Sequence, residues 1–276
     1  MKHCSCIVCN SKEYVLYDKI KDNNNNEFIL VKCRCGFVYL NPQLPESEIG
    51  KYYNVSNYLP HTSKINLISA IYKIVQQLTM RWKLSLIRKY KKDINNLLDI
   101  GGGKGEFVSF INKQHICAFN DEPFLKNNKF SINANKEKLK FDIITMWHSL
   151  EHIYDVSYLF ETINNVLEDN GYIIIAVPNF DAIERRKFFK KNWIAYDLPR
   201  HLYHFNYKTF GAFMNKKGYK IINSHTMFQD TMFNIFFSFK GYNLLKLAGV
   251  MLSSLIAIFF DKRVSSSLVY ICQKQQ

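Results

Sequence analysis

Residues 97–107 read L-L-D-I-G-G-G-K-G-E-F, and this stretch decides the fold of the 276-residue chain. An apolar strand runs into Asp99, and three glycines follow at alternate positions, Gly101, Gly103 and Gly105. Glycines between a strand and a helix let backbone N–H groups approach a ligand closely, beside the helix N-terminus. Doubly wound α/β sheets bind nucleotide-type cofactors at such a junction. The stretch therefore predicts an α/β fold with a cofactor site at the end of this strand.

The spacing of the glycines indicates which cofactor binds. The dinucleotide fingerprint G-x-G-x-x-G needs a third glycine at position 106, where this chain has Glu106. A short strand is predicted over 115–120, and Asp121 and Glu122 follow it. An acidic residue about 20 positions after a glycine loop can accept hydrogen bonds from ribose hydroxyls. We assign this role to Glu122, with Asp121 as the competitor.

Three further blocks follow in order. They are F-D-I-I-T-M-W-H-S-L-E-H-I-Y-D (141–155), N-G-Y-I-I-I-A-V-P-N (170–179) and D-L-P-R-H-L-Y-H-F (197–205). With the glycine loop and the Glu-Pro pair at 122–123, they resemble class I S-adenosylmethionine-dependent methyltransferases. The similar group contains ubiquinone-type O-methyltransferases and many bacterial glycan-modifying homologues. The resemblance covers most of the chain, from about residue 30 to 225 plus the last strand.

The resemblance implies a Rossmann-like, doubly wound, seven-stranded sheet and S-adenosyl-L-methionine as the cofactor. The residues that it implies as cofactor contacts are Asp99, Gly101, Gly103, Gly105, Glu122, Met146 and Trp147. One segment departs from the pattern, because 123–140 is too short for the usual helix, third strand and loop. We expect a short third strand at 130–134 and a more open adenine pocket.

Histidines provide the candidate catalytic groups. His148, Glu151 and His152 are spaced i, i+3 and i+4, which puts them on one face of a helix predicted beside the glycine loop. One hypothesis is a general base, a histidine that removes the acceptor's proton. A second is a divalent metal site completed by His201 or His204, and a third is a structural role. We favour the first, with His148, His152 and His201 as the candidates.

The acceptor is less well determined than the donor. A sulfonium donor is already activated, so the enzyme mainly aligns the reactants and excludes water. We expect methylation, at oxygen, of a small metabolite or of a glycan or lipid-linked intermediate. Arg200 either binds a phosphate or carboxylate of this acceptor or pairs with Asp197 or Glu184.

Five of the seven cysteines lie in the first 35 residues. In a reducing compartment such clustering favours thiolate–metal ligation over disulfides, with unliganded thiols as the alternative. We predict a ribbon that binds structural zinc through Cys6, Cys9, Cys33 and Cys35, because four thiolates leave no open coordination position. The second pair is one residue closer than the C-x-x-C-G of the resembling family. It therefore stays open whether Cys4 replaces a ligand.

A helical apolar pattern over 65–90 predicts helices that pack at the sheet edge and cap the cofactor site. The tyrosines at 52, 53 and 58, just before it, are expected to pack rather than to contact ligand. Near the C-terminus, strands are predicted at 219–225 and 267–273.

A long helical insertion, about 226–266, separates these last two strands and contains the apolar stretch 244–260. We favour helices folded over the substrate mouth. The alternatives are an interfacial hairpin that touches a membrane and a true span, which needs about 20 residues. Lys262, Arg263 and the basic run 185–191 would suit the hairpin and a lipid-linked acceptor.

Length and composition agree with a soluble enzyme of two parts, a zinc-ribbon module at 1–45 and a methyltransferase domain at 46–276. No apolar stretch follows Met1, so we expect a cytoplasmic protein, with membrane association through 226–266 as the variant. Lysine and arginine exceed aspartate and glutamate by 14, which favours polyanions as partners.

Two hypotheses from other classes remain. The positive charge would suit a zinc-ribbon RNA-binding protein or an RNA methyltransferase. We do not favour nucleic acid as the partner, because the Asn/Asp-Pro-Pro-aromatic block common in methylation of base amino groups is missing. The second rival is a non-catalytic cofactor-binding scaffold, suggested by the shortened segment after Glu122. The sequence does not fix the oligomeric state.

Overall fold

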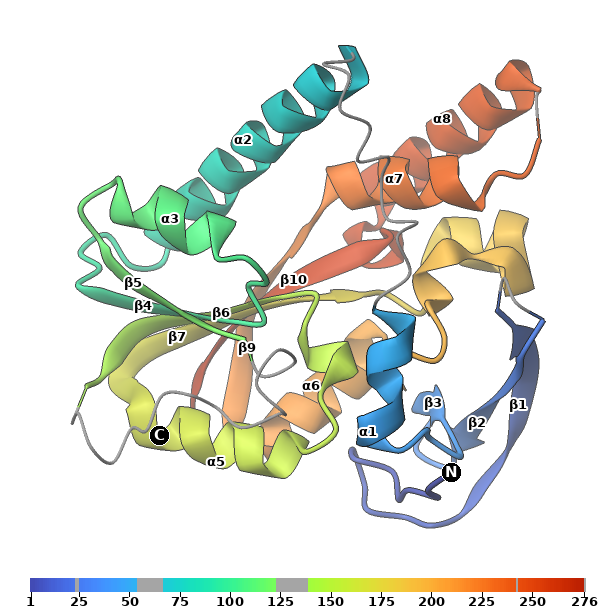
Figure 1. Cartoon of the computed structure of the whole chain (residues 1–276), viewed down its shortest axis with the longest axis horizontal. Helices are drawn as coiled ribbons and strands as arrows, with labels where there is room; N and C mark the ends of the chain where they lie inside the picture. The colour runs from blue at the N-terminus through green and yellow to red at the C-terminus, as the bar shows by residue number, and fades with distance from the viewer. Residues whose placement is uncertain (23–24, 54–66, 123–138, 242, 276) are drawn as a thin grey trace.

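The computed structural model describes residues 1–22, 25–53, 67–122, 139–241 and 243–275. Its strands form two sheets (Figure 1). The larger sheet has six described strands in the order β5-β4-β6-β7-β10-β9, and the smaller one has four in the order β1-β2-β3-β8.

The larger sheet is mixed. Its strands are β4 (Asn96–Ile100), β5 (Cys117–Asp121), β6 (Phe141–Trp147), β7 (Leu167–Pro178), β9 (Tyr219–Thr226) and β10 (Ser267–Lys274). The first four pair in parallel, and β10 is antiparallel to both β7 and β9. This confirms the predicted Rossmann-like α/β class. The third strand expected at 130–134 lies outside the described residues.

Helices cover both faces of this sheet (Figure 1). One face carries α2 (Leu67–Arg88) and α3 (Glu106–Asn112), and the other carries α5 (Val156–Val166) and α6 (Tyr207–Lys216). Neighbouring residues of a strand point to opposite faces of the sheet, so strands with consecutive apolar residues make both faces apolar. In β6, for example, Ile143 packs in the α2–α3 layer, whereas Ile144 packs in the α5–α6 layer.

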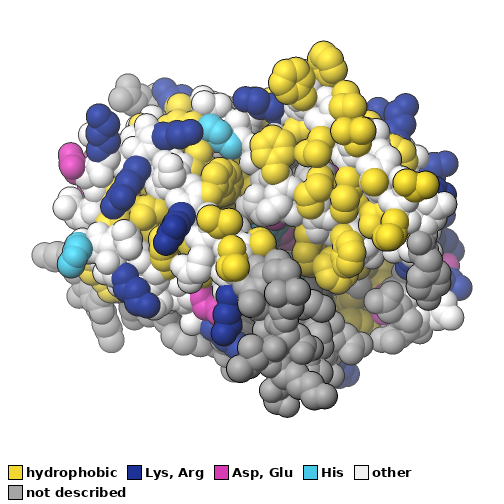
Figure 2. Space-filling view, turned by 90° about the horizontal axis from the view of Figure 1, so that it is seen from above, with side chains coloured by type: hydrophobic (Ala, Val, Ile, Leu, Met, Phe, Trp, Pro, Cys, Tyr) yellow, Lys and Arg dark blue, Asp and Glu magenta, His cyan; other side chains and the backbone are white. Residues whose placement is uncertain are grey.

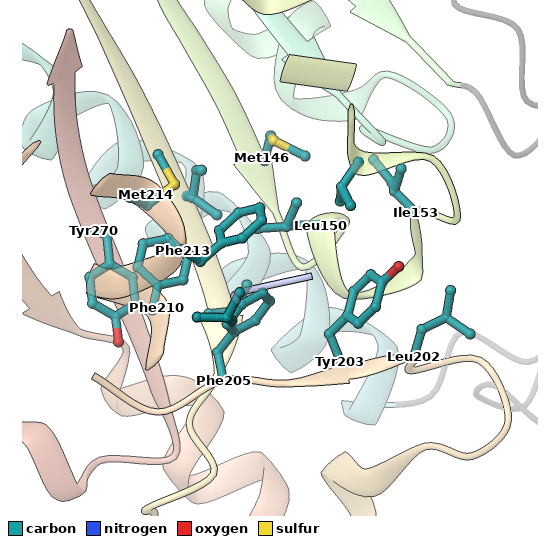
Figure 3. Packing of buried hydrophobic residues seen from close by; sticks show 14 of the residues in the cluster. Met146, Leu150, Ile153, Leu202, Tyr203, Phe205, Phe210, Phe213, Met214 and Tyr270 are labelled. Atoms are coloured by element: carbon teal, nitrogen blue, oxygen red, sulfur yellow. The ribbon is translucent and has the colours of Figure 1, made fainter. Parts of the chain in front are cut away.

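Aromatic side chains fill the α5–α6 layer. Figure 3 shows Phe205, Phe210 and Phe213 beside Tyr270 of β10. The rings of Phe210 and Tyr270 stack with their centroids 3.8 Å apart. The same layer reaches Leu150, which lies in the turn that follows β6. The candidate site therefore rests on a dense core.

The smaller sheet joins the N-terminal module to the rest of the chain. Its strands are β1 (Tyr14–Lys21), β2 (Glu27–Cys33), β3 (Val38–Leu40) and β8 (Tyr203–His204), and α1 (Glu46–Ile49) follows β3 in the sequence. Although β8 is more than 150 residues from β3 in sequence, Val38 pairs with His204 and Tyr39 with Tyr203. Phe37 and Phe205 share one core cluster with the large sheet. The residues on the two sides of the domain boundary expected near residue 45 thus pack into one continuous core.

The segment between β9 and β10 contains two helices, α7 (Phe228–Ser238) and α8 (Leu244–Phe260). Short turns complete the chain: 3-10 turns at Gly50–Tyr52, Leu150–His152, Lys190–Asn192, Ile194–Tyr196 and Lys262–Val264, and a π-type turn at Arg185–Phe189. Among the described residues, no helix has the length and apolar content needed to cross a membrane.

Candidate functional site

The glycine loop runs from the end of β4 into α3 and is hydrogen-bonded to the end of β5. Gly101, Gly103 and Gly105 all have left-handed backbones, with φ of 77°, 57° and 75°, a region that favours glycine. The Gly101 N–H donates to the Asp121 carbonyl at 2.7 Å, and the Gly103 N–H donates to Oε2 of Glu122 at 2.6 Å. The loop is therefore fastened to the end of β5 by Gly101, through Asp121, and by Gly103, through Glu122.

The neighbours of Gly102 leave no room for a side chain, a constraint that the sequence motif did not predict. A Cβ placed there would lie 2.4 Å from Oδ1 of Asn120 and 2.4 Å from Oδ2 of Asp99. Asn120 in turn donates from Nδ2 to the Gly103 carbonyl at 3.0 Å. The only signal in the sequence is that Gly102 is the middle one of three adjacent glycines, at a position where the G-x-G-x-G pattern accepts any residue.

Asp99 lies beneath the loop at the end of β4. Its side chain is buried, and Oδ1 accepts a hydrogen bond of 2.6 Å from Oγ1 of Thr145 on the neighbouring strand β6. Burial raises the pKa of Asp99 to about 6, partly offset by the Thr145 hydrogen bond and by the charge of Lys83. Asp99 is thus placed to hold the loop, because its carboxylate abuts Gly102.

At the end of β6, the side chains of Met146 and Trp147 point to opposite faces of the sheet. The Trp147 ring meets Phe107 of α3, with centroids 5.9 Å apart, and the Lys83 ammonium lies 4.3 Å from the Trp147 centroid. Met146 points to the opposite face, where it is fully buried near Leu150 (Figure 3). Strand alternation directs the Met146 side chain into the core, and the assignment of Met146 as a cofactor-binding residue stays a prediction.

His148 follows β6 in a left-handed conformation, with φ of 56°. Next to it, Ser149 donates to the Ile100 carbonyl at 2.7 Å, which fastens this segment to the glycine loop. The expected helix carrying His148, Glu151 and His152 is absent from this described stretch. A single 3-10 turn spans Leu150–His152, and α5 begins only at Val156.

His148 is paired with two carboxylates. Its Nε2 lies 2.7 Å from Oδ2 of Asp230 in α7, and its Nδ1 lies 3.4 Å from Oε1 of Glu151. Burial acts to lower the pKa of His148, but the charges and hydrogen bonds of these carboxylates outweigh it and raise the pKa to about 10. His148 is therefore protonated at neutral pH and is a poor base.

His152 points toward a different group of neighbours. Its Nδ1 lies 3.1 Å from the Tyr53 hydroxyl and 3.1 Å from the Arg200 carbonyl oxygen. Burial, and after it the electrostatic effect of His201, lowers the pKa of His152 to about 4. Its imidazole is therefore neutral at neutral pH. Of the two histidines in this turn, His152 is the one that is neutral and can accept a proton, and its low pKa makes it a weak base.

His201 is buried beside His152, with ring centroids 4.6 Å apart. Its Nδ1 is 2.9 Å from the Ala195 carbonyl oxygen, and its Nε2 is 3.4 Å from Oδ2 of Asp197. Arg200 makes a bidentate pair with the same carboxylate, with Nη2 2.6 and 2.7 Å from the two oxygens. Of the two expectations for Arg200, the geometry agrees with pairing to Asp197.

Glu151, His152 and His201 present ligand atoms within 4.8 Å of one another, a set that could hold a metal ion. Both carboxylate oxygens of Glu151 are buried, and Oε1 lies 3.4 Å from Nδ1 of His148 and 3.9 Å from Nε2 of His201. His204, the other histidine considered for such a site, is buried between the rings of Phe180 and Tyr196 and is not in this set.

The N-terminal cysteines form a second candidate centre. The sulfurs of Cys6, Cys9, Cys33 and Cys35 all lie within 4.8 Å of one another. The Cys6–Cys35 and Cys9–Cys33 sulfurs are 3.6 and 3.4 Å apart, close to the separation of about 3.8 Å that tetrahedral Zn–S bonds of 2.3 Å require. Cys4 is not in this set, and its sulfur lies 3.3 Å from Oε1 of Gln43.

A family model described as a methyltransferase domain matches residues 73–224. Similar solved structures include an S-adenosylmethionine-dependent methyltransferase from Archaeoglobus fulgidus, 19% identical, with 72% of this chain and 94% of that chain covered and a TM-score of 0.44. Another is the 1,6-didemethyltoxoflavin-N1-methyltransferase from Burkholderia thailandensis, 12% identical, with 94% and 100% covered and a TM-score of 0.47. A third is phosphoethanolamine N-methyltransferase 2 from Haemonchus contortus, 13% identical, with 71% and 53% covered and a TM-score of 0.43. No curated protein matches the chain.

Proposed function

Because this chain belongs to the methyltransferase domain family, we propose that it transfers a methyl group from S-adenosyl-L-methionine to a small-molecule acceptor. The observation that carries the donor assignment is the glycine loop after β4, whose three glycines are left-handed and whose Gly103 N–H donates to the Glu122 carboxylate at the end of β5. An acidic side chain there can accept hydrogen bonds from ribose hydroxyls, and the exposed backbone accommodates a close ligand.

The residues of the site have separate roles in this proposal. S-adenosyl-L-methionine supplies an activated methyl group on its sulfonium. The chain therefore needs to bind and orient the donor and the acceptor, and to exclude water. Glu122 and the glycines bind the donor, and Asp99 positions the loop from below. Trp147 and Phe107 form an apolar wall over which a cation already lies, the Lys83 ammonium.

We assign proton removal to His152. Its neutral imidazole can accept the proton of an acceptor hydroxyl, while Tyr53 and the Arg200 carbonyl orient the ring. His148 is a cation held between Asp230 and Glu151, and it positions this turn against α7. A neutral base suits O-methylation of a metabolite, a glycan or a lipid-linked intermediate, since a hydroxyl must lose its proton.

Calorimetric titration with S-adenosylhomocysteine tests the donor assignment. We expect binding by the wild type, no binding of NAD, and loss of binding in Gly101→Val, because a branched side chain cannot adopt the left-handed backbone. Gly249→Ala is the matched control, since a Cβ there meets nothing within 4 Å. Equal affinity of the wild type and Gly101→Val would overturn the assignment.

A metal-assisted reaction is the second candidate, favoured by the Glu151, His152 and His201 set. It predicts that a chelator abolishes turnover and that added Mg²⁺ restores it. Zinc content measured on the same samples separates this effect from loss of the N-terminal metal. Turnover that persists after chelation excludes this candidate and leaves His152 as the base.

We also propose that Cys6, Cys9, Cys33 and Cys35 bind a structural zinc ion. The proposal is supported by the four sulfurs lying within 4.8 Å of one another. Four thiolates complete a tetrahedral shell and leave no position for a substrate, so the ion would brace the N-terminal turns.

A further inference from the structure

Helix α7 has its polar residues on the inside. Asp230 contacts His148, the Asn234 amide donates to Oγ of Ser266 at 2.6 Å, and Ser238 accepts from the Ile194 N–H at 2.8 Å. The solvent-facing side carries instead four phenylalanines, Phe228, Phe233, Phe236 and Phe237. A helix of a soluble domain normally does the opposite, with its apolar side toward the core.

Helix α8 extends this apolar surface. It has no charged residue between Lys246 and Asp261, and only Val250, Ser254 and Ile258 are buried. The exposed fractions of Leu245 (87%), Phe259 (85%) and Phe260 (82%) are close to those of free side chains. Figure 2 shows the result as a broad hydrophobic patch over α7 and α8. We call it the α7–α8 surface, formed by Phe228, Phe233, Phe236, Phe237, Leu244, Leu245, Leu252, Leu255, Ile256, Phe259 and Phe260.

The charges around this surface are positive. Four exposed cations lie along the same segment: Lys240, Lys246, Lys262 and Arg263. Its two acidic residues are both engaged, Asp230 with His148 and Asp261 with Arg263 at 2.9 Å. The exposed part of the segment therefore combines apolar side chains with a net positive border.

We propose that the α7–α8 surface docks on the surface of an anionic lipid bilayer. Exposed aromatic and aliphatic side chains would enter the interface, while the bordering lysines and arginine would meet lipid phosphates. A contiguous apolar patch of this kind is unusual on a soluble monomer and marks an interaction site. A symmetric second copy fits less well, because its own four cations would meet those of the first chain.

The inner side of α7 connects this surface to the candidate site. Asp230 of α7 holds His148 at 2.7 Å, so a docked helix would place the mouth of the site near the lipid headgroups. This consequence rests on the proposed function and narrows the acceptor to an amphipathic or lipid-linked molecule. The docking itself does not depend on methyl transfer.

Sedimentation with vesicles tests the proposal on the full chain. We expect the wild type to bind vesicles of phosphatidylcholine with added phosphatidylglycerol, and not phosphatidylcholine alone. Phe259→Ser/Phe260→Ser should lower the affinity about tenfold or more through lost apolar contact. Lys262→Gln/Arg263→Gln should lower it by a similar factor, since each surface cation contributes about 1 kcal/mol toward anionic lipid.

The control variants change equally exposed residues elsewhere. Val15→Ser/Leu16→Ser removes exposed apolar side chains of β1, and Lys12→Gln/Lys32→Gln removes two exposed cations of the N-terminal module. Both should bind vesicles like the wild type. Absence of vesicle binding by the wild type, or equal losses in patch and control variants, would overturn the proposal.

A second readout identifies the competing occupant. If light scattering shows a dimer that Phe259→Ser/Phe260→Ser dissociates, and no vesicles bind, the surface is an interface between copies and the lipid proposal is wrong. S-adenosylhomocysteine affinity, measured on the same samples, should be equal in all variants. This separates a failure of docking from a failure of the proposed function.

Discussion

Gly102 is the residue whose neighbours constrain the glycine loop most tightly. We expect Gly102→Ala to lower affinity for S-adenosylhomocysteine by roughly tenfold or more and to lower the melting temperature. A Cβ would lie 2.4 Å from the Asp99 carboxylate, which Thr145 holds in place from β6. Calorimetric titration and thermal unfolding measure the two effects. In Gly50→Ala, where a Cβ meets nothing within 4 Å, both quantities should stay at their wild-type values.

The His148–Asp230 pair gives a pH-dependent prediction. The pKa of His148 is raised to about 10, so this pair stabilises the fold fully below pH 6.5, and the contribution is lost as pH rises through 10. Asp230→Asn should therefore reduce the unfolding free energy most at pH 6 and little above pH 10 (about the raised pKa). Urea unfolding across this range checks the trend.

Proton NMR provides an independent measurement of the same pair. The His148 ring should titrate near pH 10 in the wild type and at clearly lower pH in Asp230→Asn, because one of its two carboxylate partners is neutralised. An unchanged His148 titration in the variant would show that Glu151 alone sets the pKa.

His152 carries the catalytic prediction. His152→Ala should lower turnover by roughly 100-fold or more, with donor affinity nearly unchanged, because proton transfer contributes about that factor. The loss should be partly recovered at high pH, where solvent accepts the proton. His115→Asn, at an exposed left-handed position that asparagine tolerates, is the control. Full activity of His152→Ala would remove His152 from the mechanism.

Among the elements, the cysteine turns give the next prediction. Purified wild type should contain about one zinc per chain, and Cys6→Ser/Cys9→Ser should release it. Cys4→Ser should keep the metal, since the Cys4 sulfur contacts Gln43 outside the cluster. Metal analysis under reducing conditions measures both. A zinc-free wild type, or loss of zinc in Cys4→Ser, would contradict the ligand assignment.

The sequence predicted those elements whose signals are local. The strand and glycines at 97–105 identify the cofactor edge, because strand periodicity and glycine spacing both act within a few residues. The prediction of a helix that carries His148 was wrong, and the reason is a contact between residues far apart in the sequence. The backbone turns into the left-handed region at His148, and Ser149 bonds to Ile100, 49 residues earlier. Spacing alone cannot report that contact.

The separation of His148 from His152 was also beyond the sequence. His148 is paired with Asp230, which lies 82 residues later, whereas His152 meets Tyr53, 99 residues earlier. The i, i+4 spacing of His148 and His152 on a helix predicted that the two rings share one environment. Two different partners, brought in by α7 and by the segment after α1, give the rings opposite protonation states.

At the scale of the whole molecule, the N-terminal module braces the candidate catalytic turn. The Leu40 N–H donates to the Leu202 carbonyl at 2.9 Å, and the Leu202 N–H donates to the Glu151 carbonyl at 2.8 Å. Strand β3 is thus linked through one residue to the turn that holds His152. Phe37 and Phe205, with ring centroids 5.0 Å apart, continue the same connection through the core.

This connection predicts that zinc removal affects the entire chain. Calorimetry should show one unfolding transition for the wild type, and chelation or Cys6→Ser/Cys9→Ser should move that whole transition to lower temperature. An independent ribbon would instead unfold in a separate early transition and leave the main one in place. Turnover should fall more than S-adenosylhomocysteine affinity, because β3 braces the His152 turn and not the glycine loop. Two separate transitions, or full activity without zinc, would show that the shared core does not couple the module to the site.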